Sequence, residues 1–407
     1  MGDLLLRDVR PLGGASVDVL VRDGVIAAMG SGLPRVAGVL EEPGAGALLL
    51  PGLVESHTHL DKTLWGLPWY VNAVVGPRLA DRIDNERRFR AGSGHDAAAQ
   101  SLALARAFLA QGTTRLRTHV DIDTDAGLRH LEGVLRTRET LGDAMELQMV
   151  AFPQSGLIVR PGTAALLEEA LRLGADVLGG LDPQAIDGER DASLDLLFAI
   201  AGRHGKPLDI HLHETGEEGA ATLAGILDRV QSWGMQRRVV ISHCFCLGDV
   251  DEAGRGRLLE RMARLEVAIV TTGTASRPVP PLLACRAAGV RVAAGNDGIR
   301  DTWTPYGRPD MLERAMLLGL RNNLRRDDEL ALALETVTSA GAEVCGFADH
   351  GLAPGCRADL VLVQARNIQE AVVAHPERRL VVSRGRIVAR QGSLISSATI
   401  AGSTTGA

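Results

Sequence analysis

The sequence predicts a (β/α)8 TIM-like barrel joined to a small β-sandwich domain that both ends of the chain build together. Three observations predict this fold class. Eight apolar, strand-like runs alternate with helical patterns in the middle of the chain, the two ends carry short alternating strands, and polar residues follow several of the eight runs. With 407 residues, 45% of them hydrophobic, the chain can bury a core of the required size.

The two ends of the chain are predicted to form the small β domain. Residues 1–50 and 353–395 contain short runs of alternating apolar and polar residues, separated by Asp-Gly and Arg-Gly pairs that favour tight turns. We expect these two segments to pair with each other. The small, polar residues of the segment 396–407 predict a flexible tail.

Residues 51–352 are predicted to form the barrel. Helical patterns such as DAAAQSLALARAFLAQG and TAALLEEALRLG lie between the apolar runs, repeat apolar residues at three and four positions, and end in glycine. Eight such units in about 300 residues are typical of a (β/α)8 barrel. An open doubly wound sheet is the alternative, but neither GxGxxG nor GxxxxGK[ST] follows the first run.

Charge and composition favour a small molecule as the partner. A net charge of -6 gives no broad basic field, which argues against nucleic acid and against an anionic membrane. No apolar run approaches the ~20 residues that span a bilayer, and the N-terminus lacks a signal pattern, so we expect no membrane partner and a cytoplasmic location. The five cysteines lack CxxC spacing, as is typical of reduced thiols. We also expect a homo-oligomer.

Polar side chains gather where the predicted barrel strands end, which is where barrels carry their chemistry. His57 and His59 follow the first run, and since residues i and i+2 of a strand share a face, both imidazoles can project inward. The other strand-end residues are His119, Gln154, His211, His213, Glu214, His243 and Asp297.

His57, His59, His211 and Asp297 predict a metal site. Three imidazoles and a carboxylate suit one divalent transition metal, Zn(II) or Fe(II), with a position left for water. An isolated HxH pair is more often incidental, but the residues that end the other strands favour a site here. A metal lowers the pKa of its bound water towards ~7, so hydroxide would be present at neutral pH.

The ordered motifs resemble those of the amidohydrolase superfamily, and within it the branch of cytosine deaminases and N-isopropylammelide isopropyl amidohydrolases. They are PGLVESHTHLDK, RTHVD, VAFPQSG, IHLHE, ISH, GNDGIRDTW and ADLVLV, and they extend over nearly the whole chain. The resemblance implies an enzyme that uses metal-activated water to replace an amino or alkylamino group on a nitrogen heterocycle with oxygen. The alternative is a non-catalytic barrel kept for binding or assembly, which would not need the complete set of polar residues.

The resemblance also implies a role for each site residue. The four residues of the metal site match the family's metal ligands. Glu214 matches its proton shuttle, and a carboxyl group there could give a proton to a ring nitrogen and then to the leaving amine. His243 matches the residue that assists the activated water, Asp297 could accept a proton from that water, and Gln154 matches a side chain that orients the ring.

Lys62, Trp303 and Gly298 are predicted to contact the substrate. Lys62 resembles a lysine near the substrate of the ammelide enzymes, and a solvated loop lysine is the alternative. Trp303 and Trp69 are expected to be pocket walls. Cytosine deaminases usually have a second acid at the position of Gly298, so we expect a wider pocket there and a preference for a bulkier cyclic amidine over cytosine.

The roles of His119 and His213 stay open at this point. His119 is interpreted as a hydrogen-bonded core histidine in preference to a catalytic one. His213 could line the pocket or support another residue. Binuclear members of the superfamily bridge two metals with a carboxylated lysine on the fourth strand, and GADVLGGLDPQ contains no lysine, so one metal per chain is expected.

Overall fold

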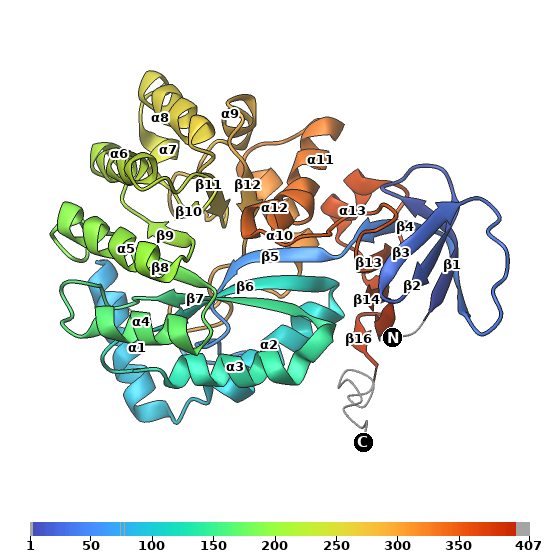
Figure 1. Cartoon of the computed structure of the whole chain (residues 1–407), viewed down its shortest axis with the longest axis horizontal. Coiled ribbons are helices and arrows are strands. Elements are labelled where there is room, and N and C mark those ends of the chain that lie inside the picture. Colours follow the sequence, from blue (N-terminus) through green and yellow to red (C-terminus); the bar gives the residue numbers. More distant parts are fainter. Residues whose placement is uncertain (1–2, 74, 77, 396–407) are drawn as a thin grey trace.

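The computed structural model describes residues 3–73, 75–76 and 78–395, and within them the strands form two eight-stranded sheets (Figure 1). In one sheet, strands β5 to β12 follow each other in chain order and every neighbouring pair is parallel. A bridge between Thr58 and Asp297 joins the first strand to the end of the last and closes the barrel. The predicted (β/α)8 fold is confirmed. Its strands are β5 (Leu53–Thr58), β6 (Thr113–Asp121), β7 (Glu146–Phe152), β8 (Val177–Leu181), β9 (Leu208–Leu212), β10 (Val239–His243), β11 (Ala268–Thr271) and β12 (Val292–Ala294).

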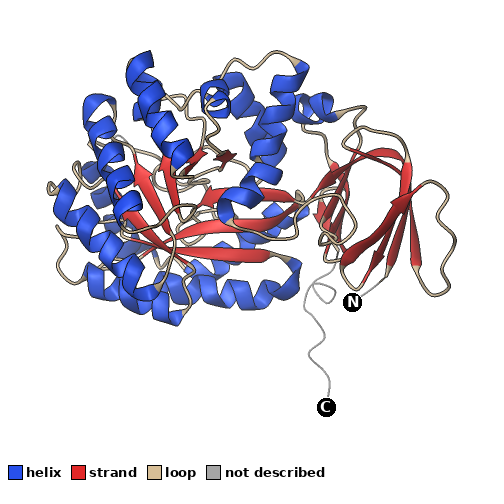
Figure 2. Ribbon diagram, turned by 45° about the horizontal axis from the view of Figure 1, so that its top comes forward, coloured by secondary structure: helices blue, strands red, loops and turns tan. Residues whose placement is uncertain are grey.

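Helices surround the barrel strands (Figure 2). Their apolar faces and the strands share one large buried cluster, which includes Phe108, Leu197 and Ile241. None of the helices in the described part of the chain has the length and apolar character that a membrane crossing requires. The helices are α1 (Leu79–Ser93), α2 (Ala97–Ala110), α3 (Arg129–Leu141), α4 (Thr163–Leu173), α5 (Arg190–His204), α6 (Gly216–Ser232), α7 (Cys246–Asp249), α8 (Glu252–Arg264), α9 (Leu282–Ala287), α10 (Met311–Arg321), α11 (Asp327–Thr336), α12 (Ser339–Cys345) and α13 (Ile368–Ala374).

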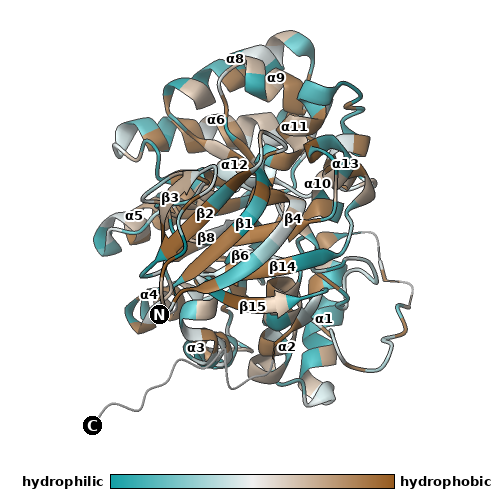
Figure 3. Ribbon diagram, turned by 90° about the vertical axis from the view of Figure 1, so that its right-hand side faces the viewer, coloured by the Kyte–Doolittle hydropathy of each residue, from teal (hydrophilic) through white to brown (hydrophobic). Residues whose placement is uncertain are grey.

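The second sheet combines strands from both ends of the chain, in the order β16-β15-β14-β13-β4-β1-β2-β3. The antiparallel pair β4·β13 joins the two ends, and only β1·β4 is parallel within this sheet. Figure 3 shows hydrophobic residues along these strands, and those of both halves pack into one cluster. The strands are β1 (Leu4–Pro11), β2 (Val17–Arg22), β3 (Val25–Gly30), β4 (Leu40–Pro51), β13 (Leu360–Val363), β14 (Arg378–Ser383), β15 (Arg386–Arg390) and β16 (Ser393–Leu394).

Gly52 connects this sheet to the barrel, because β4 ends at Pro51 and β5 begins at Leu53. A Cβ atom on Gly52 would lie 2.2 Å from the hydroxyl of Thr114 and 2.8 Å from the Cβ of Asp359. A residue with a side chain therefore does not fit at position 52 without a shift of these neighbours. The exact division at residues 50/51 and 352/353 stays a prediction. The expected tail, 396–407, lies outside the described residues.

Candidate metal centre

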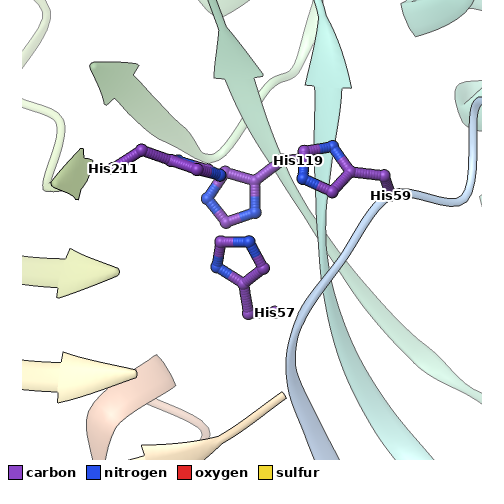
Figure 4. Close-up of side chains that lie close together, drawn as sticks. All are labelled: His57, His59, His119 and His211. Atoms are coloured by element: carbon purple, nitrogen blue, oxygen red, sulfur yellow. The ribbon is translucent and has the colours of Figure 1, made fainter. Parts of the chain in front are cut away.

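Five imidazoles and one carboxylate meet at the C-terminal ends of the barrel strands. Their ligand atoms form two overlapping groups, and within each group they lie within 4.8 Å of one another. One group is His57, His59, His119 and His211, whose rings face each other in Figure 4. The other is His57, His211, His243 and Asp297. Strands β5, β6, β9 and β10 supply four of the imidazoles, and the segments just after β5 and β12 supply His59 and Asp297.

The buried nitrogens of this cluster show that a cation fits here. Nε2 of His57 and both ring nitrogens of His119, His211 and His243 are buried and have no hydrogen-bond partner within the described residues. A buried polar atom without a hydrogen-bond partner costs about 1–3 kcal/mol of stability. A cluster of such atoms around one point therefore requires an explanation. Imidazoles and a carboxylate are the donors that a divalent transition metal prefers. The cluster therefore has the composition of a metal site.

The protonation states of the cluster also suit a metal. Burial lowers the pKa of His59 to about 4 and that of His119 to about 3, so both rings are neutral at neutral pH. Burial would raise the pKa of Asp297, but the neighbouring imidazoles of His57 and His59 outweigh it and the pKa falls well below its usual value. Its Oδ1 lies 3.2 Å from Nε2 of His59 and 3.6 Å from Nε2 of His57.

The backbone is strained at two of these residues. His243 has a φ angle of 69° and Asp297 has one of 63°, both in the left-handed region. Non-glycine residues held there cost of order 1–3 kcal/mol and are found preferentially at functional sites. The strain turns each side chain towards the centre just where its strand ends.

His119 lies inside the barrel as part of the imidazole cluster. The side chain is buried and faces inward, yet neither ring nitrogen makes a hydrogen bond within the described residues, and Nε2 lies 3.5 Å from Oδ1 of Asp209. Its ring centroid is 4.0 Å from that of His57 and 4.6 Å from that of His211. His119 is thus a buried residue of the imidazole cluster, and its role as a core histidine in preference to a catalytic one stays a prediction.

His213 lies beside the cluster and is absent from both ligand groups. Its Nδ1 is 2.6 Å from Oδ2 of Asp182, and its ring stacks on His243 with centroids 4.3 Å apart. Burial would lower the pKa of His213, but the charge of Asp182 and this hydrogen bond outweigh it and raise the pKa. The side chain of His213 is 28% exposed, whereas His243 beside it is buried.

Glu214 is held firmly by its surroundings. Its Oε1 accepts hydrogen bonds from the backbone N–H groups of Gln184 (2.9 Å) and Ala185 (3.0 Å), and its Oε2 accepts one from the hydroxyl of Thr222. Burial raises the pKa of this carboxyl group. A fixed carboxyl with a raised pKa has the properties that proton transfer near neutral pH requires.

Lys62 lies beside both Gln154 and Trp303, two other side chains that the sequence predicts at the substrate. Nζ of Lys62 donates to Oε1 of Gln154 at 2.5 Å and lies 5.5 Å from the ring centroid of Trp303. Lys62 is only 7% exposed, so the alternative of a solvated loop lysine is wrong. Trp69, by contrast, is 64% exposed and packs against Arg300, so it is not enclosed as a pocket wall.

Two buried acids, Glu86 on α1 and Asp121 on β6, were not predicted from the sequence as part of the site. Glu86 accepts a hydrogen bond from Nε1 of Trp303 and lies 3.5 Å from Nζ of Lys62. Asp121 lies 3.3 Å from the same nitrogen, and its other oxygen accepts from Arg90 at 3.1 Å. Burial would lower the pKa of Lys62, but these carboxylates outweigh it and raise the pKa, so Lys62 stays charged.

His59, Asp61 and Asp121 form a third group of ligand atoms within 4.8 Å of one another. Both acids already have partners in neighbouring side chains. Asp61 pairs with Nδ1 of His130 at 2.7 Å, and Asp121 pairs with Lys62 and an arginine, as described above. Lys62 and Arg90 oppose a metal ion at the third group, so the two groups that share His57 and His211 are the better metal site.

The space beside Gly298 is filled by a neighbouring side chain. A Cβ atom at Gly298 would lie 2.0 Å from Oδ2 of Asp301, which is 2% exposed and whose Oδ1 accepts from the N–H groups of Trp303 and Thr304. Burial raises the pKa of Asp301 to about 7. The carboxyl group of Asp301 therefore occupies the place that a side chain at position 298 would take, and the wider pocket stays a prediction.

Ser242 and Asp209 complete the surroundings of the cluster and were missed in the sequence. Oγ of Ser242 lies 2.8 Å from Nδ1 of His57 and donates to Oδ1 of Asp209 at 2.6 Å. Asp209 precedes His211 by two positions on β9, so the strand's alternation could have indicated it. Its contact with Ser242 depends on the register between β9 and β10, which the sequence does not give.

Known proteins resemble this chain over most of its length. A model of the Amidohydrolase family matches residues 45–389. The crystal structure of N-isopropylammelide isopropylaminohydrolase from Burkholderia multivorans is 61% identical, with a TM-score of 0.95 over 97% of this chain and 100% of that chain. The structure of 5-methylcytosine deaminase from Klebsiella pneumoniae is 25% identical, with a TM-score of 0.84 over 94% of this chain and 97% of that chain. N-isopropylammelide isopropyl amidohydrolase from Pseudomonas sp. strain ADP is 28% identical over 362 residues, which are 86% of this chain and 88% of that protein.

Proposed function

Because the chain belongs to the amidohydrolase family, we propose that it is a metal-dependent hydrolase which replaces an alkylamino or amino group on a nitrogen heterocycle with oxygen. The observation that carries this proposal is the cluster of buried imidazole nitrogens without partners beside Asp297. The similarity to N-isopropylammelide isopropylaminohydrolase favours an N-alkylated, oxygen-bearing triazine as the substrate, with an alkylamine as the leaving group. A cytoplasmic location and a homo-oligomer stay predictions.

His57, His59, His211 and Asp297 are proposed to hold one divalent metal, Zn(II) or Fe(II). The unpartnered nitrogens and the low pKa of Asp297 support this choice of ligands. The absence of lysine from β8 supports a single ion, since the carboxylated lysine of binuclear relatives has no counterpart there. A divalent metal supplies a hydroxide nucleophile near neutral pH by lowering the pKa of water.

The protons of the reaction are assigned to Asp297 and Glu214. Asp297 accepts the proton of the attacking water. Glu214, whose pKa burial raises, gives a proton to a ring nitrogen as water adds to the ring carbon. It then takes the remaining proton of the added hydroxyl group and passes it to the departing amine, and the proton held by Asp297 returns to Glu214. His243 stabilises the negative charge that develops on the added oxygen. Rigid anchoring of Glu214 by two backbone N–H groups keeps its carboxyl oriented through both transfers.

Lys62 is proposed to act on the substrate through Gln154. All three N–H donors of an ammonium group can be satisfied, and Gln154, Asp121 and Glu86 each lie within 3.5 Å of Nζ of Lys62. The Lys62 contact turns the carbonyl oxygen of Gln154 inward. The Gln154 amide N–H2 group is thereby left to donate to an oxygen on the substrate ring, while Trp303 offers an aromatic surface for the ring.

The release of amine from a substrate panel tests this function. N-isopropylammelide, ammelide, cytosine and 5-methylcytosine are incubated with the purified protein, and isopropylamine and ammonia are quantified separately. We expect kcat/KM for isopropylamine release from N-isopropylammelide to exceed kcat/KM for ammonia release from cytosine. A wide preference for cytosine would contradict the proposed substrate class, and release of neither product by any compound would favour the non-catalytic alternative.

A further inference from the structure

The barrel interior holds a second set of buried polar side chains, which lies next to the imidazole cluster. Arg117 on β6, Asp209 on β9 and Ser242 on β10 are all 3% exposed or less. Barrel interiors are usually packed with branched apolar side chains. Burying an ion pair costs desolvation energy that the pair itself often fails to recover. A polar group at this position therefore points to a function other than stability.

Arg117 and Asp209 are held in one arrangement. Oδ2 of Asp209 accepts from Nη1 of Arg117 at 2.9 Å. Arg117 also donates from Nε to Oε1 of Gln148 at 2.6 Å and from Nη2 to the backbone oxygen of Cys345 at 3.1 Å. With the guanidinium fixed at three points, Oδ1 of Asp209 is left to face the imidazole cluster.

The direction of the hydrogen bonds from Asp209 follows from its charge. A carboxylate paired with an arginine can only accept hydrogen bonds. The hydroxyl of Ser242 therefore donates its hydrogen bond to Oδ1 of Asp209, 2.6 Å away. The Ser242 oxygen must then accept from Nδ1–H of His57, 2.8 Å away. His57 is thereby held in the tautomer whose Nε2 carries no proton, and this Nε2 is the buried nitrogen without a partner.

Asp209 also borders a second ring of the cluster. Its Oδ1 lies 3.5 Å from Nε2 of His119, whose ring packs on that of His57. One carboxylate oxygen therefore adjoins Ser242 on one side and His119 on the other. A change at Asp209 is expected to alter the placement of both imidazoles.

We propose that Asp209 and Ser242 are positioning residues of the metal centre, which fix the tautomer and orientation of His57 so that Nε2 presents its lone pair to the ion. The proposal rests on the proposed function, because it assumes that this cluster holds a metal. Outer partners of metal-binding histidines typically contribute 10–100-fold to metal affinity or activity.

The test compares metal retention in Ser242→Ala and Asp209→Asn with that in matched controls. The controls are Ser383→Ala and Asp359→Asn, which alter a similar buried Ser, Asp and Arg group away from the imidazole cluster. Asp359 accepts a hydrogen bond from Arg357 at 2.5 Å and lies 3.5 Å from the hydroxyl of Ser383. Each variant is loaded with Co(II) or Zn(II). The rate of metal loss to a chelator, the visible spectrum of the Co(II) form and the melting temperature of the metal-free protein are measured.

We expect Ser242→Ala and Asp209→Asn to lose metal about 10–100-fold faster and to change the Co(II) spectrum. Ser383→Ala and Asp359→Asn should retain metal like the parent, whatever their effect on the melting temperature. If Asp209→Asn does not fold, the rate of metal loss from Ser242→Ala alone tests the proposal. Metal loss from Ser242→Ala within twofold of the parent's would overturn the proposal. These readouts need no substrate, so a parent that binds metal but hydrolyses nothing contradicts only the proposed function, and a parent that binds no metal overturns both.

Discussion

The ammonium group of Lys62 and the side-chain amide of Gln154 are in direct contact, with Nζ of Lys62 2.5 Å from Oε1 of Gln154. The contact joins the segment after the first barrel strand to the segment after the third. Glu86 and Asp121 lie within 3.5 Å of the same ammonium group, so Lys62 is also a counterion for two buried acids. Lys62 is thus part of the framework of the site.

Lys62→Met should destabilise the protein strongly. The change leaves Glu86 and Asp121 buried with only Arg90 as a counterion, and breaking a buried pair from one side costs about 3–5 kcal/mol. Denaturation by urea measures the free energy of unfolding. The other lysine of the chain provides the control, since Nζ of Lys206 donates only to the backbone oxygen of Ala175 within the described residues. Equal losses for Lys62→Met and Lys206→Met would show that the buried acids do not depend on Lys62.

Glu214→Gln should keep metal content and fold close to those of the parent and lower kcat by about 100-fold or more. Glutamine can still accept from the N–H groups of Gln184 and Ala185 and can donate to Thr222, so the contacts survive while the transferable proton is lost. Single-turnover kinetics and metal analysis check both halves of this expectation. Turnover near that of the parent would mean that Glu214 serves the fold alone.

Gly298→Ala should destabilise the protein by about 1–3 kcal/mol, the usual cost of forcing an atom into a packed site. The new Cβ would meet Oδ2 of Asp301, which backbone N–H groups hold in place through Oδ1. A double-mutant cycle with Asp301→Ala isolates this contact, because removing the carboxyl should make Gly298→Ala much less costly. Additive effects of the two changes would show that the chain relieves the clash elsewhere.

The sequence was sufficient to predict the barrel and the position of its imidazoles. Strand alternation and the rule that barrels carry polar residues at strand ends locate His57, His59, His211 and Asp297 without any knowledge of contacts. The strands of the second sheet also follow from alternation and turn signals. Each of these features depends on spacing within one short segment, which a sequence displays directly.

The missed residues depend on contacts between distant segments. Glu86 lies in a charged helix, α1, that resembles any solvated helix, and its burial depends on Lys62 and Trp303. Asp301 fills the space at Gly298 because of the path of the intervening loop. Ser242 is directed towards Asp209 by the register of two parallel strands. No periodicity within one segment encodes these relationships.

Metal analysis combined with amine release tests the central claim most directly. The protein is purified without chelator, its metals are counted by mass spectrometry, and isopropylamine release from N-isopropylammelide is followed before and after complete metal removal. We predict about one divalent transition metal per chain, loss of turnover on removal, and recovery on return of Zn(II) or Fe(II). Turnover that survives complete metal removal would contradict the claim that His57, His59, His211 and Asp297 form the catalytic metal centre.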